Sequence, residues 1–511
     1  SVVLLCSGFA LYSFFRLSAA EGQKDFNLYE LVPSTTSAVF VTDDVLEFVA
    51  EVDELTCSKN QQYLYVSKLF SYLKQSLYAL SEDTPHGLSR QMNQMLISFH
   101  EPDNERNQVL YCRLGNGDKE LVNRFVRKYI SSLYPPKTFI YKGEEIIIYP
   151  MADGDFLACY LTSDFMALSF QKKLIENVID AYKSGKSLAD DSTFTGIRAP
   201  KKSAAAATIY TRMQGMMGWT EFDMKMKDDF IYFSGITHDA DTCFAFINQL
   251  RQQQSVKGFP GEVLPSTAFY FSRQGITDWV SLLSYGNAQG QSVPARTSEV
   301  QNRDKEFSRY LMENAGQDLV ACLFQREDTL QGAAAVLSLS VADVTEAERM
   351  LRALVNAASA DEGRRNPRIT FCYTVNKAYP IYRLPQTTLF EQLTSFAEPT
   401  LDVYAAFYGG RLLLAPDADA LAHYIRQLDK GEVLNGAMVY QTGMDHLSDS
   451  YHFMLMADFD HIFQQSENHV RFVPDFFLRN ADFFRHFTLF VQFACADGVV
   501  YPNIVLKYKS E

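Results

Sequence analysis

The sequence lacks the short signatures of the common catalytic and nucleotide-binding folds. It contains no G-x-S-x-G nucleophile elbow, no G-x-x-x-x-G-K-[ST] phosphate loop and no G-x-G-x-x-G dinucleotide fingerprint. Lys183-Ser-Gly-Lys-Ser187 resembles a phosphate loop, but it lacks the first glycine and follows an expected helix, not a strand. We interpret it as a helix end that stops at Gly185. We therefore expect no catalytic or cofactor-binding residues, and we predict that the chain is not an enzyme.

Cysteine is sparse, and its spacing excludes the usual zinc sites. There are eight cysteines and no C-x-x-C pair. Several lie inside apolar strand patterns, as in 109–114 and 493–496, so we interpret them as small buried hydrophobic residues. A disulfide framework is not expected in a chain this long, although the sequence leaves a single pair open. The cysteines are Cys6, Cys57, Cys112, Cys159, Cys243, Cys322, Cys372 and Cys495.

Three groups of residues leave metal binding open as an alternative. None has metal-site spacing: there is no H-x-H or H-E-x-x-H pair, and neither Asp-x-Asp pair continues into a calcium loop. We interpret the histidines as surface or satisfied residues, the methionines as core filler and the aspartates as helix caps. We therefore expect no metal ligand and no cofactor. The groups are His446, His452, His461, His469 and His486; Met213, Met216, Met217, Met224 and Met226; and Asp239, Asp241, Asp417 and Asp419.

Basic character is also lacking, which bounds the class of partner. The formal net charge is −14, and the basic residues are interspersed with acids. A nucleic-acid partner is not expected, because phosphate binding needs a basic face. Hydrophobic residues at 47% and charged residues at 21% are typical of a folded chain. Aromatic residues at 14% indicate either a strand-rich core or an aromatic-lined groove.

Only one apolar run is long enough to suggest a membrane segment, and it lies at the N-terminus. Residues 1–15 carry no charge and Arg16 ends the run. We predict that residues 1–17 are an N-terminally truncated transmembrane anchor and that residues 18–27 are a polar tether. A cleaved signal peptide ending near Ala20 and a lipid anchor at Cys6 are the alternatives. The anchor predicts a single-pass inner-membrane protein whose body lies in the periplasm.

The most informative feature that is present is an internal repeat. Glu30-Leu-Val-Pro-Ser-Thr-Thr in the first half corresponds to Glu262-Val-Leu-Pro-Ser-Thr-Ala in the second. At a similar offset, Lys183-Ser-Gly-Lys-Ser-Leu corresponds to Asp429-Lys-Gly-Glu-Val-Leu. We predict two α+β repeats, at residues 28–258 and 259–511.

Periodicity within each repeat predicts the fold class. Amphipathic helices are expected at 172–183 and 418–428, each after a pair of strands. A strand pair is expected at 487–496 and 499–508 around Asp497-Gly498. We predict an α+β fold of duplicated, largely antiparallel sheets with helices packed on one face, preceded by the transmembrane helix. We also expect a helical region over much of 60–98, a polar loop at 286–304 and a capping box at 345–348.

Several of these segments resemble a family of membrane-anchored bacterial envelope proteins known as a domain of unknown function. The resemblance rests on Leu31-Val-Pro-Ser-Thr35, on Phe165-Met-Ala-Leu-Ser-Phe170 and on residues 184–194, and it covers most of 28–240. It implies the envelope location and the fold, and it carries no activity to this chain.

Together these patterns predict a non-enzymatic, membrane-tethered extracytoplasmic protein. We expect it to bind a partner protein of the envelope or membrane, or to support an envelope assembly. The alternative is a carrier or sensor of an apolar ligand such as a lipid, which the aromatic content favours.

Overall fold

A computed structural model of the chain divides it into two compact units. Unit 1 comprises residues 1–50 and 65–214, and unit 2 comprises residues 51–64 and 215–511. No helix within the described ranges is both long and apolar enough to cross a membrane. The predicted anchor and the tether through residue 25 lie outside those ranges. The structure describes residues 26–60, 92–100, 106–115, 118–126, 134–151, 154–198, 205–212, 218–238, 245–283, 297–326, 333–361, 369–375, 377–394, 400–464, 473 and 475–509.

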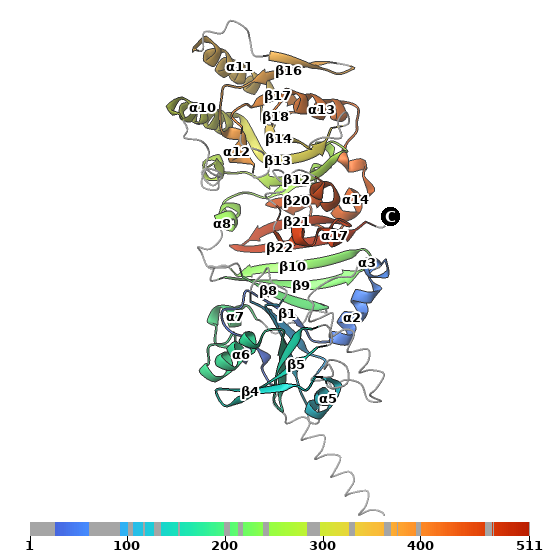
Figure 1. The fold of residues 1–511 in the computed structure, drawn as a ribbon. Helices are drawn as coiled ribbons and strands as arrows, with labels where there is room; N and C mark the ends of the chain where they lie inside the picture. The colour runs from blue at the N-terminus through green and yellow to red at the C-terminus, as the bar shows by residue number, and fades with distance from the viewer. Residues whose placement is uncertain are drawn as a thin grey trace, which may run out of the picture. The chain divides into compact units, whose positions relative to one another are not determined.

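Unit 1 is an antiparallel sheet with helices beside it (Figure 1). Its strands are β1 (Ala38–Thr42), β2 (Met95–Phe99), β3 (Gln108–Arg113), β4 (Lys137–Tyr141), β5 (Glu144–Pro150), β6 (Phe156–Leu161), β7 (Phe165–Ser169) and β8 (Ala207–Thr211). Its helices are η1 (Leu28–Glu30), α5 (Asp118–Phe125), α6 (Lys172–Ser184) and α7 (Ser192–Ile197), and α2 (Val45–Glu54) runs across the boundary in the sequence. The strand order is β8-β1-β2-β3-β7-β6-β5-β4.

Unit 2 contains a longer antiparallel sheet. Its strands are β9 (Trp219–Lys227), β10 (Phe230–His238), β12 (Ala268–Gly275), β13 (Ala315–Gln325), β14 (Ala333–Val341), β15 (Ile369–Tyr373), β16 (Ala378–Arg383), β17 (Tyr404–Tyr408), β18 (Arg411–Ala415), β20 (Phe453–Asp458), β21 (Phe487–Ala496) and β22 (Val499–Tyr508). They follow the order β9-β10-β22-β21-β20-β12-β13-β14-β18-β17-β16-β15. A separate pair joins β11 (Val256–Lys257) to β19 (Ser450–Tyr451).

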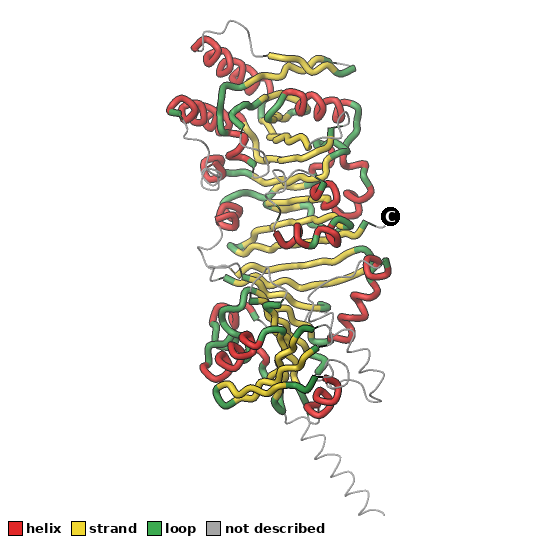
Figure 2. The backbone as a smooth tube through the Cα atoms, viewed as in Figure 1, coloured by secondary structure: helices red, strands yellow, loops and turns green. Residues whose placement is uncertain are grey.

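The helices of unit 2 are distributed along the length of this sheet (Figure 2). They are α3 (Thr56–Lys59), α8 (Ala245–Arg251), η3 (Pro260–Glu262), α10 (Ser298–Asn314), α11 (Val344–Asp361), α12 (Leu389–Leu393), α13 (Ala418–Asp429), η4 (Leu434–Gly436), α14 (Met438–Met444), α15 (Phe459–Phe463), α16 (Asp475–Arg479) and α17 (Ala481–Phe484).

The strand order of unit 1 recurs inside unit 2. β8-β1-β2-β3-β7-β6-β5-β4 is matched position for position by β20-β12-β13-β14-β18-β17-β16-β15. Helix α6 contacts β5, β6 and β7, and α13 contacts the corresponding β16, β17 and β18. The amide of Leu188 donates to the carbonyl of Val32 over 2.9 Å, and that of Leu434 donates to Leu264 over the same distance. The segments that the sequence pairs as equivalent therefore make equivalent contacts.

The boundary between the compact units differs from the boundary between the sequence repeats. The hairpin β9–β10, which belongs to the first repeat in sequence, lies in unit 2, where β10 pairs with β22 of the second repeat. The break between units falls at 214/215 in this part of the chain, whereas the predicted end of the first repeat is residue 258.

Gly185, which we expected to end the first amphipathic helix, and Gly431, its equivalent in the second repeat, are both left-handed. Gly185 follows α6 directly with φ of +63°, and Gly431 lies two residues beyond α13 with φ of +76°. This prediction is confirmed, and it agrees with the preference of glycine for positive φ after a helix.

The prediction that the helices cover one face is wrong for unit 2. Helices α10, α11 and α12 pack on one face of the sheet, and α13 packs on the other, so that two separate cores form. The reason lies in β13, where Leu319, Ala321 and Leu323 enter the first core while Val320, Cys322 and Phe324 enter the second. A strand that is apolar at consecutive positions is covered on both sides.

Three local predictions also need correction. Residues 95–98, at the end of the predicted helical region, belong to the strand β2 and not to a helix, because this apolar run pairs between β1 and β3. Residues 61–91 of the same prediction lie outside the described ranges. Helix α10 begins at Ser298, inside the predicted polar loop. The side chain of Asp343 caps α11 by accepting from the amides of Thr345 and Glu346, so the proposed capping box is not the cap.

Candidate functional site

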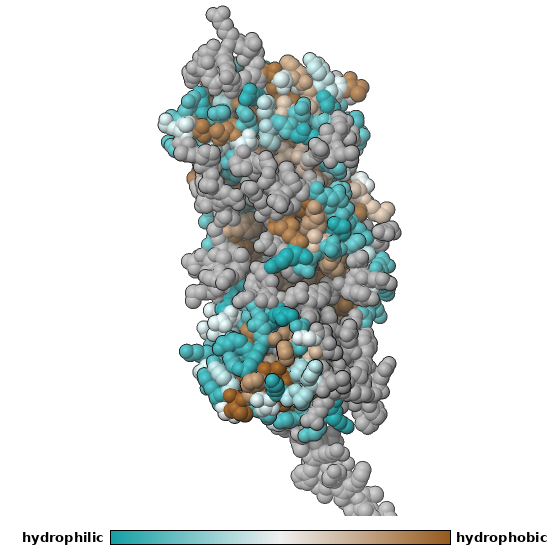
Figure 3. Space-filling model, in the orientation of Figure 1, coloured by the Kyte–Doolittle hydropathy of each residue, from teal (hydrophilic) through white to brown (hydrophobic). Residues whose placement is uncertain are grey.

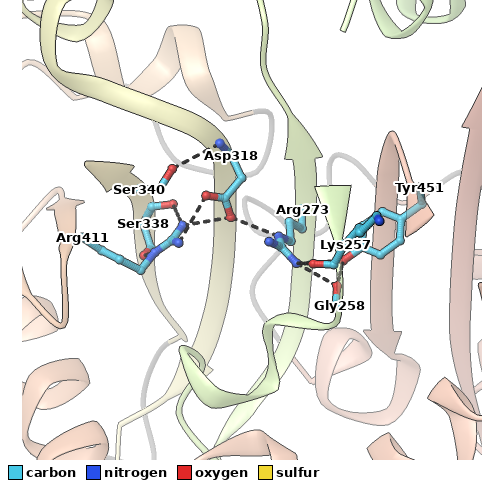
Figure 4. Close-up of polar contacts among 8 residues, drawn as sticks. All are labelled: Lys257, Gly258, Arg273, Asp318, Ser338, Ser340, Arg411 and Tyr451. Atoms are coloured by element: carbon cyan, nitrogen blue, oxygen red, sulfur yellow. Dashed lines mark hydrogen bonds and ion pairs between the residues drawn. The ribbon is translucent and has the colours of Figure 1, made fainter. Parts of the chain in front are cut away.

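A cluster of charged side chains in the interior of unit 2 lies across four neighbouring strands. Arg273 comes from β12, Asp318 from β13 and Arg411 from β18, while β14 contributes two serines (Figure 4). The side chains of Arg273, Asp318 and Arg411 are only 15%, 9% and 13% exposed. Buried charges are costly unless they are paired and hydrogen-bonded. The hydrogen-bond partners of each charged group therefore show which donors are satisfied within the protein and which are left for a ligand.

Asp318 is held between the two guanidinium groups. Nε of Arg273 donates to Oδ2 of Asp318 over 3.0 Å. Arg411 donates to both carboxylate oxygens over 3.3 Å, in a forked arrangement. Arg411 also donates to the hydroxyl and the carbonyl of Ser338 over 2.5 and 2.9 Å.

Arg273 reaches a second set of acceptors on its other side. Its Nη1 donates to the carbonyls of Lys257 and Gly258 over 3.2 and 2.8 Å, and to the hydroxyl of Tyr451 over 3.2 Å. Within the described part of the chain, Nη2 of Arg273 has no hydrogen-bond acceptor. A guanidinium presents five N–H groups, so Arg273 keeps donors for a ligand.

The electrostatics leave the cluster positively charged. Burial on its own would raise the pKa of Asp318, but Arg411, Ser340 and Arg273 outweigh it and hold that pKa below its usual value. Burial would lower the pKa of Arg273, but Tyr451 and Asp318 outweigh it and hold that pKa above its usual value. Two guanidinium groups therefore share one carboxylate at neutral pH, which leaves an excess of one positive charge.

A cavity of about 520 Å³ lies beside the cluster, at an irregularity in β13. Ala315 pairs with Val341 and Leu319 with Leu339, so residues 316–318 stand opposite a single residue of β14. Such bulges often occur next to functional sites. The cavity is lined by Lys257, Arg273, Gly316, Gln317, Asp318 and Ser340, among others, and its volume lies in the range of ligand sites.

The fold does not require this cluster, because unit 1 has the same strand arrangement without it. The paired registers give Arg273 and Arg411 equivalent positions in unit 1, and extending the β1–β2 register by one residue gives one for Asp318; none of those positions is charged. The topology can thus be built with uncharged side chains at these places, which favours a role in binding over a role in folding. The equivalents are Val41 for Arg273, Gln94 for Asp318 and Phe165 for Arg411.

Five of the six cysteines that the structure describes lie as the sequence predicted. Five are buried and carry free thiols, and a sixth, Cys495, is partly buried. Burial raises the pKa of the Cys112 thiol to about 12, which keeps it protonated at neutral pH. The prediction of small buried residues is confirmed for these five, whereas Cys6 and Cys243 lie outside the described ranges. The five are Cys57, Cys112, Cys159, Cys322 and Cys372.

The late histidines take separate local roles. Nδ1 of His452 accepts from the backbone of Cys495 over 3.1 Å. His446 contacts the ring of Phe230, and His461 lies 3.4 Å from Asp458. His469 lies outside the described ranges, within which no three His, Cys, Asp or Glu side chains group as metal ligands.

The remaining candidate residues from the sequence lie in ordinary structural positions. The Asp417 side chain caps α13 by accepting from the amide of Ala420 over 2.7 Å, which confirms the capping prediction for this residue. Asp239 and Asp241 are outside the described ranges, as are three of the five methionines. In the loop-like segment 183–187, Lys183 pairs with Glu144 at 2.7 Å and Ser187 donates to Asp190.

Sequence reasoning missed the Arg273 cluster because its members are up to 138 residues apart. The available signal was a single charge inside each of three largely apolar strands, and it says nothing about which strands are neighbours. Comparisons with protein-family models, with curated proteins and with solved structures find no match to this chain.

Proposed function

We propose that this chain is a non-enzymatic binding protein with a duplicated α+β body, tethered to the inner membrane and exposed to the periplasm. In this proposal a partner protein of the envelope places an acidic group in the cavity beside Arg273. The envelope location rests on the apolar N-terminal run and on the family resemblance. The duplication rests on the recurring strand order and on the equivalent contacts of Leu188 and Leu434.

The observation that carries the binding role is the unused donor capacity of Arg273 at the wall of a cavity. The cluster has an excess of positive charge, while the chain as a whole has a net charge of −14. An isolated carboxylate of a partner would gain charge-assisted hydrogen bonds there. The excess charge lies on side chains that are mostly buried. A partner that offers only apolar groups would cover this charge without pairing it, so the site also discriminates against such partners.

A crosslinking experiment in native membranes tests this role. A photoreactive residue is placed at Gln317, which is exposed at the cavity, and as a control at Gln325, which is exposed at the other end of the same strand. We expect a discrete protein adduct from position 317 and not from position 325. Arg273→Met should lower the adduct yield at least tenfold while the melting temperature confirms that the variant is folded.

Two results would contradict the proposal. One is an adduct from position 317 whose yield is insensitive to Arg273→Met, and the other is equal adduct formation from both positions. The second candidate function, a carrier or sensor of an apolar ligand, is favoured by one observation, an apolar cavity on the sheet of unit 1.

A further inference from the structure

Unit 1 has an open apolar cavity of about 300 Å³ on the α6 side of its sheet. Its walls are mainly Phe139, Ile148, Phe156 and Phe170, and lysines stand at its edge. Phe139 is 41% exposed and Phe156 is 57% exposed, although both are large apolar side chains. Figure 3 shows apolar atoms reaching the surface in the part of the view that holds β4 in Figure 1. Contiguous exposed apolar side chains often mark a binding site, whereas single exposed apolar residues scattered over a surface are common in any protein.

The corresponding place in unit 2 is polar, so the fold does not demand an apolar surface there. The registers make Thr370 the equivalent of Phe139. In the same way Arg383 is the equivalent of Ile148 and Asp402 the equivalent of Phe156, and these two form an ion pair at 2.9 Å. At this place one copy of the fold thus has an exposed ion pair, while the other has apolar side chains around an open cavity.

The charges around the unit 1 cavity favour an anionic head group. Lys172 lies with its Nζ 5.2 Å from the ring centroid of Phe139, and it pairs with Glu176 at 2.6 Å. Lys173 shares the same carboxylate at 3.4 Å. Lys137, on the rim, is exposed and has no ion pair within the described ranges. Lys137 and Lys172 line the cavity, and Lys172 shares the carboxylate of Glu176 with Lys173, so the lysines here outnumber that carboxylate.

We propose that this cavity binds a single-chain fatty acid, with the acyl chain against Phe139 and Phe156 and the carboxylate at Lys137. A volume of 300 Å³ is at the lower end for ligand sites, which suits one short acyl chain and not a two-chain phospholipid. This inference rests on the unit 1 cavity alone and does not depend on the partner site at Arg273.

The test uses decanoic acid with a photoreactive diazirine near its methyl end, added to membranes that contain the full chain. Adducts are mapped by mass spectrometry to peptides of the chain. We expect labelling on β4, β5 and β6, with competition by unlabelled decanoate and much weaker competition by decanol. Phe156→Asp should reduce the labelling at least tenfold, and Lys137→Met should reduce it several-fold.

Matched variants separate loss of the site from loss of the fold. Ile140→Asp is the control, because Ile140 is 72% exposed on β4 but points to the opposite face from Phe139. The double variant Ile148→Arg with Phe156→Asp installs the ion pair of unit 2, and it should lose labelling while the melting temperature is kept. Crosslinking from Gln317 should be unchanged in all these variants, so failure here is distinguishable from failure of the partner site.

Three outcomes would overturn the fatty-acid site. The first is labelling that Phe156→Asp leaves intact, and the second is an equal loss in Ile140→Asp. The third is labelling of the same peptides by a diazirine phosphatidylcholine at equal strength, which would indicate a membrane surface contact in place of a fatty-acid site.

Discussion

Replacing Asp318 by Asn should destabilise unit 2 by about 3 kcal/mol. Removing one partner of a buried ion pair typically costs about 3–5 kcal/mol, because the charge left behind is uncompensated. Asp318 is the one carboxylate that the two guanidinium groups share, and all three side chains are at most 15% exposed, so screening by water is small. We expect the lower end of the range because Arg411 keeps its bonds to Ser338 and Arg273 keeps those to Gly258 and Tyr451.

The two tryptophans provide an assay that is specific for this unit. Trp219 and Trp279 are both buried and both belong to unit 2, and the sequence contains no other tryptophan. Urea unfolding followed by tryptophan fluorescence therefore reports the free energy of unfolding where the substitution acts. The free energy of unfolding of the wild type should exceed that of Asp318→Asn above about pH 4. This difference should fall as the pH drops through the lowered pKa of Asp318, because protonation removes the same charge.

A triple variant tests whether the cost comes from unpaired charge. Arg273→Val, Asp318→Gln and Arg411→Phe together install the residues of unit 1 and leave no unpaired charge. Replacing a complete buried ion cluster by apolar groups is often close to neutral. Here two of the replacements are apolar and the third is uncharged, so the triple variant should be more stable than Asp318→Asn alone. A loss below 1 kcal/mol in Asp318→Asn, or a triple variant that is the less stable of the two, would refute this reasoning.

Three further predictions concern other parts of the chain. Gly185→Val and Gly431→Val should each lower the free energy of unfolding by about 1 kcal/mol or more, because a residue with a Cβ is strained in the left-handed conformation. At either position a Cβ would meet at most one atom, at 4.0 Å. The cost is therefore conformational and not steric, and it should be similar in both variants. Fluorescence should report the second variant and circular dichroism the first, and an unchanged melting temperature in both would contradict the capping role. The contact with Asp458 raises the pKa of His461. This contact should therefore stabilise the folded protein below the ordinary histidine pKa of about 6.5, and the stabilisation should be lost as the pH rises through the pKa of His461 in the folded protein. The melting temperature of wild type minus that of His461→Gln should thus be larger at pH 5 than at pH 8, and an equal difference would argue against the pair. Full-length protein should resist carbonate extraction from membranes, whereas a mature N-terminus mapped beyond residue 17 would show cleavage of the predicted anchor.

The parts of the fold that could be predicted are those with strong local signals. The stripe of apolar residues in 172–183 predicted α6 to within one residue, and Asp497-Gly498 predicted the turn between β21 and β22. The equivalence of 183–188 with 429–434 could be recognised because the glycine and the following leucine are kept. Residues 95–98 were predicted wrongly as part of a helical region, because a short apolar run has no periodicity that separates a buried strand from a helix.

The candidate site could not be predicted for a different reason. Arg273, Asp318 and Arg411 meet only because β12, β13, β14 and β18 are neighbours, and this adjacency depends on a strand that returns after about 70 residues. Local patterns carry no information on such long-range pairing. The cavity also depends on the extra residues in β13, which leave no signature beyond Gly316, where a Cβ would come within 2.5 Å of the Ser340 hydroxyl.

At both proposed sites the two copies of the fold differ in the same direction, because unit 2 has charged side chains where unit 1 has apolar ones. At one place unit 2 has buried charges where unit 1 has Val41 and Phe165. At the other, unit 2 has an ion pair where unit 1 has Ile148 and Phe156. Random drift on a common scaffold would scatter polar and apolar exchanges over the surface. Here the exchanges form two local clusters, and each cluster is complete in one unit and replaced in the other by side chains that still pack. This distribution is expected if the two units bind different ligands. The duplication thereby supplies an internal reference for each site, since the other copy shows which side chains the backbone tolerates.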